Sequence, residues 1–107
     1  MKVYIAHPLR ADSTFEALLN VWSALRWACR ALREGHRPRV THWLAIPGIL
    51  NPFDRADDEL ARAYGLAELR DCDIVWVCGP RVSAGMQVEI DLAERLGIPV
   101  RVMEGDA

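Results

Sequence analysis

A serine, a glycine and a glutamate follow one another at short intervals, at Ser83, Gly85 and Glu89, where an apolar run gives way to a helical pattern. A helix amino terminus presents unpaired N–H groups and a partial positive charge. A Ser83 cap, with the close backbone approach that Gly85 allows, can therefore hold a phosphate or a sugar hydroxyl. Positions 85 and 89 stack on one helix face, which places Glu89 on the side of Gly85. The competing interpretations are a Ser83 that only caps the helix and a Glu89 on a solvated face.

A second polar group follows the first apolar run of the chain, Lys2 to Ala6. His7 ends that run, Pro8 holds the turn and Arg10 adds a cation, so an anion or a sugar hydroxyl can be bound there. The alternative is a His7 that caps local backbone groups.

A third group, His42 and Trp43, ends a short strand predicted over Arg39 to Leu44. An aromatic plane in a cleft can stack a nucleobase, whereas the remaining tryptophans fall in helix or strand patterns and are interpreted as structural: Trp22, Trp27 and Trp76. Asp57 and Asp58 are interpreted as a solvated helix face.

Several kinds of site are excluded by what the sequence lacks. It contains no GxGxxG, no Walker-type Gly-Lys-Ser/Thr and no His-Glu-x-x-His, and its cysteines are not spaced as zinc ligands: Cys29, Cys72 and Cys78. We expect reduced, mostly buried thiols, no metal and no cofactor.

Composition describes one ordinary globular domain over residues 1–107, with 51% hydrophobic and 26% charged residues. A net charge of −2 argues against binding a nucleic-acid polymer. The start has no signal-peptide pattern, and no stretch reaches the ~18 apolar residues of a membrane helix, so we expect a cytoplasmic protein without membrane contact.

The elements that must position these residues alternate along the chain. Strands are predicted over 2–6, 39–44, 74–78 and 99–103, and helices from Asp12 or Ser13 to Gly35, over 54–70 and from Ser83 to Gly97. This order favours an α/β fold, a Rossmann-like or flavodoxin-like doubly wound parallel sheet of about four strands. Ligands bind such sheets beyond the carboxyl ends of the strands, so residues 7–10, 42–44 and 79–85 should converge.

The helices are expected to carry large apolar faces. In the first, the pattern comprises Phe15, Leu18, Leu19, Trp22, Leu25, Cys29 and Leu32. In the second, which is expected to pack less deeply, one side carries Leu60, Ala63, Tyr64 and Ala67, with Leu66 as a further candidate, and Gly65 is a weak point. The first stripe and the four tryptophans exceed what so small a domain covers alone, so we expect a homo-oligomer.

Three segments together resemble the nucleoside 2-deoxyribosyltransferase superfamily, in particular its short bacterial and phage branch related to 2′-deoxynucleoside 5′-phosphate N-hydrolases. They are Tyr4–Pro8, Cys72–Cys78 and Ser83–Ile90, with Gly97–Val100 beyond them. The resemblance implies that Glu89 is the nucleophile that attacks the sugar C1′ atom, that Ser83 and Gly85 hold a 5′-phosphate, and that Met86 and the first loop contact substrate. It also implies a nucleoside or nucleotide as the small-molecule partner, and a site built at subunit contacts.

The chain departs from the family at His7, at Gln87 and at Gly65, which stands where active members offer an aspartate that protonates the leaving base. A proton donor contributes ~10²–10⁴-fold in rate, so a different acid must act here: His42, Asp57, Asp58 or Glu68. The sequence therefore predicts an N-glycosidase or deoxyribosyl transferase, or else a non-catalytic nucleotide-binding domain of the same fold.

Overall fold

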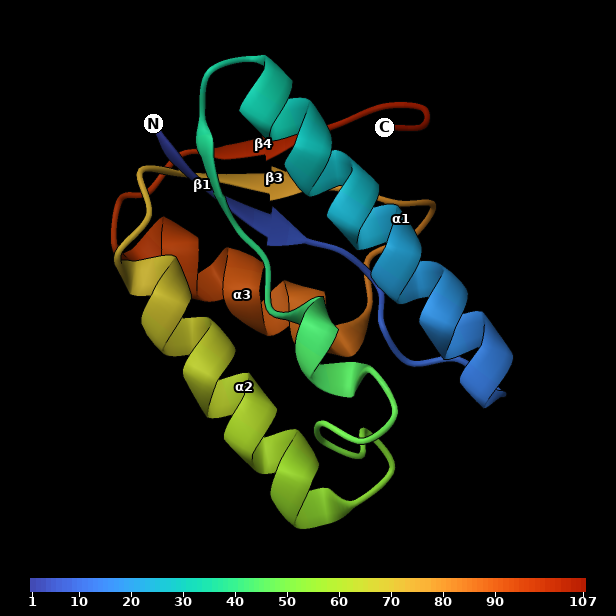
Figure 1. The fold of residues 1–107 in the computed structure, drawn as a ribbon. Coiled ribbons are helices and arrows are strands. Elements are labelled where there is room, and N and C mark those ends of the chain that lie inside the picture. Colours follow the sequence, from blue (N-terminus) through green and yellow to red (C-terminus); the bar gives the residue numbers. More distant parts are fainter.

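Four parallel strands form one sheet covered by helices on both faces in the computed structural model, which describes residues 1–107. The sheet order is β2-β1-β3-β4, from β1 (Lys2–Ala6), β2 (Arg37–Arg39), β3 (Ile74–Val77) and β4 (Val100–Val102). The helices are α1 (Thr14–Arg33), α2 (Arg55–Arg70) and α3 (Ala84–Arg95), with the 3₁₀ turn η1 at His42–Ala45. The predicted doubly wound fold is confirmed (Figure 1).

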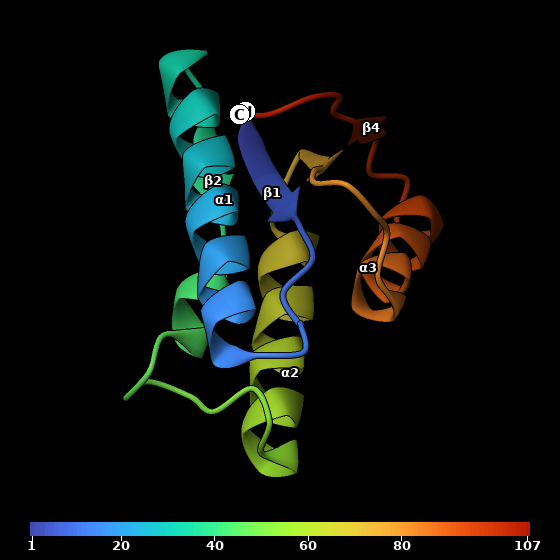
Figure 2. The same ribbon diagram turned by 90° about the vertical axis from the view of Figure 1, so that its right-hand side faces the viewer.

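The two faces of the sheet have separate cores, with α1 on one side and α2 and α3 on the other (Figure 2). Beneath α1, Trp27 and Ala31 pack with Trp76. On the opposite face, Leu69 and Met86 pack with β1 and β3 residues. Since β1 and β3 are covered on both sides, they are apolar apart from Lys2 at the start of β1, as central parallel strands require. None of the helices has both the length and the apolar character needed to traverse a bilayer.

The predicted second strand is misplaced. β2 covers Arg37–Arg39, pairing with Lys2–Tyr4, and His42 and Trp43 lie in η1 instead of ending a strand. The physical reason is that β2 is an edge strand, where Pro38 is tolerated without an N–H donor. The chain then turns away from the sheet, and the His42 Nε2–H donates to the His7 carbonyl at 2.7 Å.

The residues of α1 and α2 that pack against the sheet are not the apolar stripes seen in the sequence, and the interpretation of Trp22 as structural is wrong. The side of α1 against the sheet consists mainly of small residues, with Ala24 and Ala31 fully buried, whereas Phe15 and Trp22 are 70% and 61% exposed. In α2 the buried positions are Gly65 and Leu69. Small side chains allow the helix backbones to approach the sheet closely, and the large apolar residues are left outside. Trp22 is therefore not a core residue.

Gly79, directly after β3, brings the ends of the two central strands together. Its φ is +93°, and a Cβ there would lie 2.9 Å from Pro8 Cδ and 3.1 Å from His7 Nε2. Only glycine adopts this backbone conformation without strain and leaves room for the loop after β1. The contact places the two loops at the edge of the sheet where ligands bind in doubly wound folds.

Candidate active site

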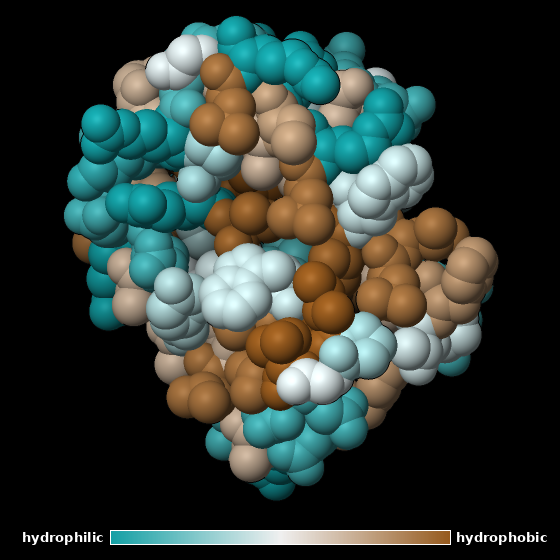
Figure 3. All heavy atoms as spheres, in the orientation of Figure 1, coloured by the Kyte–Doolittle hydropathy of each residue, from teal (hydrophilic) through white to brown (hydrophobic).

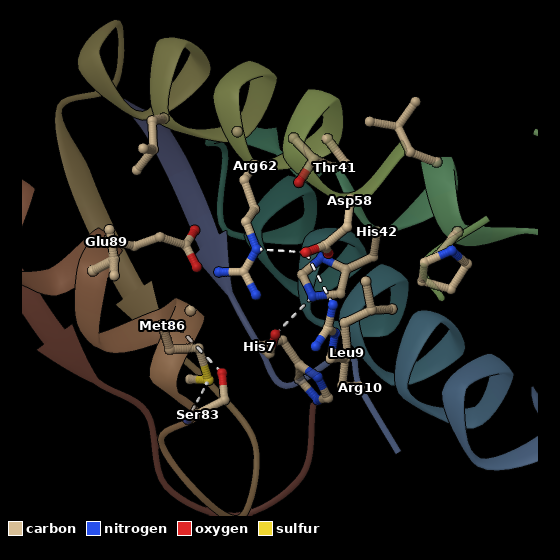
Figure 4. A pocket seen from close by; sticks show the side chains of 18 of the residues that line it. His7, Leu9, Arg10, Thr41, His42, Asp58, Arg62, Ser83, Met86 and Glu89 are labelled. Atoms are coloured by element: carbon tan, nitrogen blue, oxygen red, sulfur yellow. Dashed lines mark hydrogen bonds and ion pairs between the residues drawn. The ribbon is translucent and has the colours of Figure 1, made fainter. Parts of the chain in front are cut away.

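A pocket of about 380 Å³ opens beyond the carboxyl ends of β1 and β3, between η1, α2 and the start of α3 (Figure 4). Of the nine residues expected from the sequence to bind or attack substrate, seven line it: His7, Arg10, His42, Ser83, Gly85, Met86 and Glu89. Pro8 and Trp43 do not line it, and Trp43 is 42% exposed outside it. The three segments expected to converge therefore do so, but the aromatic plane that could stack a base is absent from the wall.

Glu89 is the carboxylate of this pocket. Its side chain is held one turn after Gly85 on α3, and burial raises its pKa to about 7. A hydrogen bond from Tyr4 and the positive charge of Arg62 oppose that increase. Glu89 is thus half-buried and is present in both protonation states at neutral pH. Strongly perturbed carboxylates in clefts are typical of functional sites.

Tyr4 begins a segment that resembles the family, but it was not among the expected site residues, because it lies in an apolar run that predicts core. It is 2% exposed, and burial, followed by the charge of Glu89, raises its pKa well above the usual 10. Its hydroxyl therefore stays protonated and can donate to Glu89, and Thr41 is a further neighbour whose hydroxyl opposes the increase in the pKa. A Cβ at Gly65 would come within 3.0 Å of the Tyr4 oxygen. Gly65 is thus the position at which α2 approaches β1 closely, which its helix propensity alone did not reveal.

The α3 amino terminus is partly satisfied by its own residues. Ser83 Oγ accepts from Met86 N–H at 3.2 Å, and Ser83 N–H donates to Met86 Sδ at 3.4 Å. A helix leaves about four N-terminal N–H groups without backbone partners, so those of Ala84 and Gly85 remain for a ligand. Ala84 and Gly85 both line the pocket. Ser83 acts as the cap, and the anion-binding groups are the backbone donors that follow it.

Two arginines share one aspartate at the pocket wall. Asp58 Oδ2 lies 3.0 Å from Arg10 Nη2 and 2.9 Å from Arg62 Nε. Arg62 lies between Asp58 and Glu89, and its Nη1 is 3.4 Å from where a Gly85 Cβ would be (Figure 4). Arg62 was not expected from the sequence; the only local signal was its spacing of four residues from Asp58, which is usual for a surface helix pair.

Both histidines are neutral and engaged with the chain. His7 Nδ1–H donates to the Pro8 carbonyl at 2.7 Å, and its Nε2 accepts from Ser23 at 2.9 Å. Burial lowers the pKa of His7, and lowers that of His42 to about 4. With its Nε2–H donated to the His7 carbonyl, His42 retains a buried Nδ1 that has no partner. His7 therefore follows the local-capping alternative.

The four candidate proton donors named from the sequence either lie outside the pocket or are engaged with other groups. Glu68 lies outside the pocket and pairs with Arg39 at 3.4 Å. Asp57 lines the pocket but accepts from Asn51 N–H at 2.9 Å. Asp58 is engaged with its two arginines, and His42 is neutral near pH 7 with its single ring N–H donated to the His7 carbonyl. None of the four is a free acid beside Glu89.

Comparison with known proteins adds a family and a fold. The family model "Domain of unknown function (DUF7768)" matches residues 1–103, and no curated protein matches the chain. A 2-deoxyribosyltransferase from Bacillus psychrosaccharolyticus is similar over 95% of this chain and 71% of its own, with 22% identity and a TM-score of 0.66. A conserved protein from Enterococcus faecalis V583 is similar over 99% of this chain and 64% of its own, with 22% identity and a TM-score of 0.56. At 22% identity, these similarities show that the chain and the two proteins share a fold.

Proposed function

The chain belongs to the DUF7768 family, and for it we propose cleavage of the N-glycosidic bond of a nucleoside or nucleoside 5′-monophosphate, with Glu89 as the nucleophile. The observation that carries this proposal is a half-buried carboxylate with a pKa of about 7, which lines the pocket beside a free helix amino terminus. The fold shared with a 2-deoxyribosyltransferase supports a nucleoside substrate class.

The proposed reaction is a double displacement. A Glu89 carboxylate oxygen attacks C1′, the bond from C1′ to the base nitrogen breaks, and the base leaves with the bonding electrons. The hydrogen bond from Tyr4 orients the attacking carboxylate. Water, losing a proton, or a second base then attacks C1′ and releases Glu89, which gives hydrolysis or transfer respectively.

The 5′-phosphate of a nucleotide fits the positive side of the same pocket. The free N–H groups of Ala84 and Gly85 and the helix dipole favour an anion, and the guanidinium of Arg62 is adjacent. Binding of a phosphate would draw Arg62 from Asp58 to the ligand, because an arginine and a phosphate form a strong charge-assisted pair.

A second candidate function is nucleotide binding without catalysis. It is favoured because a glycine, Gly65, stands where the proton donor would be needed. Its backbone lies against Tyr4, beside Glu89, where an acid would be needed, and no other free acid takes its place. Loss of the proton donor costs ~10²–10⁴-fold in rate, enough to leave a binding pocket with negligible turnover.

Substitution of Glu89 tests the proposal. Incubation of wild type and Glu89→Ala with a panel of deoxynucleosides and their 5′-monophosphates, followed by chromatography of free base, should show release by wild type only. Calorimetry should show that the variant still binds, since the backbone donors at Ala84 and Gly85 remain. The control is Glu94→Ala, an exposed glutamate on the same helix, which should match wild type.

Base release by Glu89→Ala at the wild-type rate would remove Glu89 as nucleophile. Binding by wild type without release of any tested base would favour the nucleotide-binding domain.

A further inference from the structure

One side of α1 carries large apolar residues that the rest of the chain leaves wholly or partly exposed. They recur at intervals of three and four and form what we name the α1 seam: Phe15, Leu18, Trp22, Leu25, Cys29 and Leu32. Phe15, Trp22 and Leu32 are each more than half exposed, and Cys29 is an exposed free thiol. In the orientation of Figure 1, hydrophobic side chains gather in a band over α1 and the segment beside it (Figure 3). Alternating intervals of three and four describe a helix face that packs against another helix.

The order of residues in the α1 seam is self-complementary when two copies run antiparallel. With the two-fold axis between residues 23 and 24, Phe15 lies opposite Leu32, Leu18 opposite Cys29, and Trp22 opposite Leu25 of the second copy. Each of these pairs across the interface then consists of two apolar residues. The two largest side chains, Phe15 and Trp22, each lie opposite a leucine. A two-fold interface requires this property, because the same patch must fit itself.

Charges beside the α1 seam select the antiparallel direction. Asp12 and Glu16 lie at its amino end, whereas Arg26, Arg30 and Arg33 lie toward its carboxyl end. Neither Asp12 nor Arg33 forms an ion pair within its own chain. Antiparallel pairing brings Asp12 of one copy beside Arg33 of the other. It also places the positive end of each helix dipole beside the negative end of the other, which is favourable. A parallel pair would instead place arginine against arginine.

We propose that the α1 seam is the interface of a two-fold antiparallel dimer of this chain. The partner is a second copy of the chain, because the apolar residues of α1 pair with one another and its acidic and basic ends attract each other when two copies run antiparallel. The α1 seam lies on the α1 face of the sheet, opposite α2 and α3, which supply half of the residues that line the pocket. The dimer therefore does not depend on the proposed reaction.

Disulfide trapping tests both the interface and its direction. Leu18→Cys, oxidised with copper phenanthroline, should form a covalent dimer through Cys29 of the second copy. Wild type should not, because in an antiparallel pair the two Cys29 residues lie ~16 Å apart along the helix axis, at 1.5 Å per residue. The control is Leu60→Cys, an exposed position on α2, which should give no specific dimer. A covalent dimer of wild type through Cys29 would overturn the antiparallel arrangement.

Sedimentation from low to high micromolar concentration provides the second test. Trp22→Glu should raise the dimer Kd about thirtyfold or more, as expected for a central aromatic residue, and retain the far-ultraviolet spectrum because the side chain is exposed. Asp12→Arg should weaken the dimer about fivefold, and adding Arg33→Asp should restore it. Leu60→Glu should have no effect. A wild type that is monomeric throughout, or a dimer lost in Leu60→Glu but kept in Trp22→Glu, would overturn the proposal.

Discussion

Burial of Glu89 governs how the proposed reaction responds to pH. Attack on C1′ requires the carboxylate form, and desolvation raises the pKa of Glu89 to about 7, so the reactive fraction increases as the pH rises through that value. We expect the rate of base release at saturating substrate to rise about tenfold per pH unit below 6 and to level off above 8. A rate profile over this range measures the midpoint. A profile that is flat from pH 5 to 8 would contradict the assignment of Glu89.

Tyr4 affects the protonation equilibrium of the Glu89 carboxyl. Its hydroxyl donates to Glu89 and so lowers the pKa of the carboxyl relative to burial alone. A hydrogen bond to a charged group contributes about 1.5–3 kcal/mol, so Tyr4→Phe should move the midpoint of the rate profile upward by about one pH unit or more. Because phenylalanine keeps the buried ring, the urea midpoint should change little by comparison. An unchanged midpoint would exclude Tyr4 as a positioning residue for Glu89.

At the scale of elements, the loop after β3 depends on Gly79 for its contact with the loop after β1. Alanine there meets a φ of +93° and two close atoms, so Gly79→Ala should lower the free energy of unfolding by about 3 kcal/mol. Gly97, at φ +72° with nothing within 4 Å, is the control, and Gly97→Ala should cost only about 1 kcal/mol. Urea denaturation compares the two. Equal losses would show that the loop contact contributes nothing.

At the scale of the whole molecule, the buried carboxyl makes stability depend on pH. The folded pKa of Glu89, about 7, exceeds its ordinary value of 4.5, so the folded state binds the proton more tightly. The stability that Glu89 contributes is therefore complete below pH 4.5 and is lost as the pH rises through 7. Glu89→Gln stays neutral, so its free energy of unfolding relative to wild type should rise from pH 4 to pH 8 by up to about 3 kcal/mol.

His42 acts in the opposite direction, because its pKa in the folded state is about 4 and the stability it contributes is lost as the pH falls from 6.5. Taking the difference between Glu89→Gln and wild type removes this effect, since both proteins contain His42. Urea denaturation at four or five pH values is sufficient. A difference that does not vary with pH would show that Glu89 is solvated.

The sequence by itself determined the order of elements, their caps and the segments that meet. Alternating apolar runs and helical patterns fixed the doubly wound sheet, and Ser13, Asp54 and Ser83 cap the three helices. These signals are local, since a cap or a buried strand depends on neighbouring residues. The position of Glu89 one turn after Gly85 followed for the same reason.

Only the tertiary structure decided which face of each helix is buried and what surrounds Glu89. The small residues of α1 and Gly65 of α2 pack against the sheet because they allow close approach, a property that hydrophobicity along the sequence does not reveal. Tyr4 and Arg62 join Glu89 from elements far apart in the chain. The ring of His7, which lines the pocket, is held by its contact with Ser23. Trp43 lies outside the pocket because β2 ends early, at Arg39. Such contacts form between distant segments, so no local pattern specifies them.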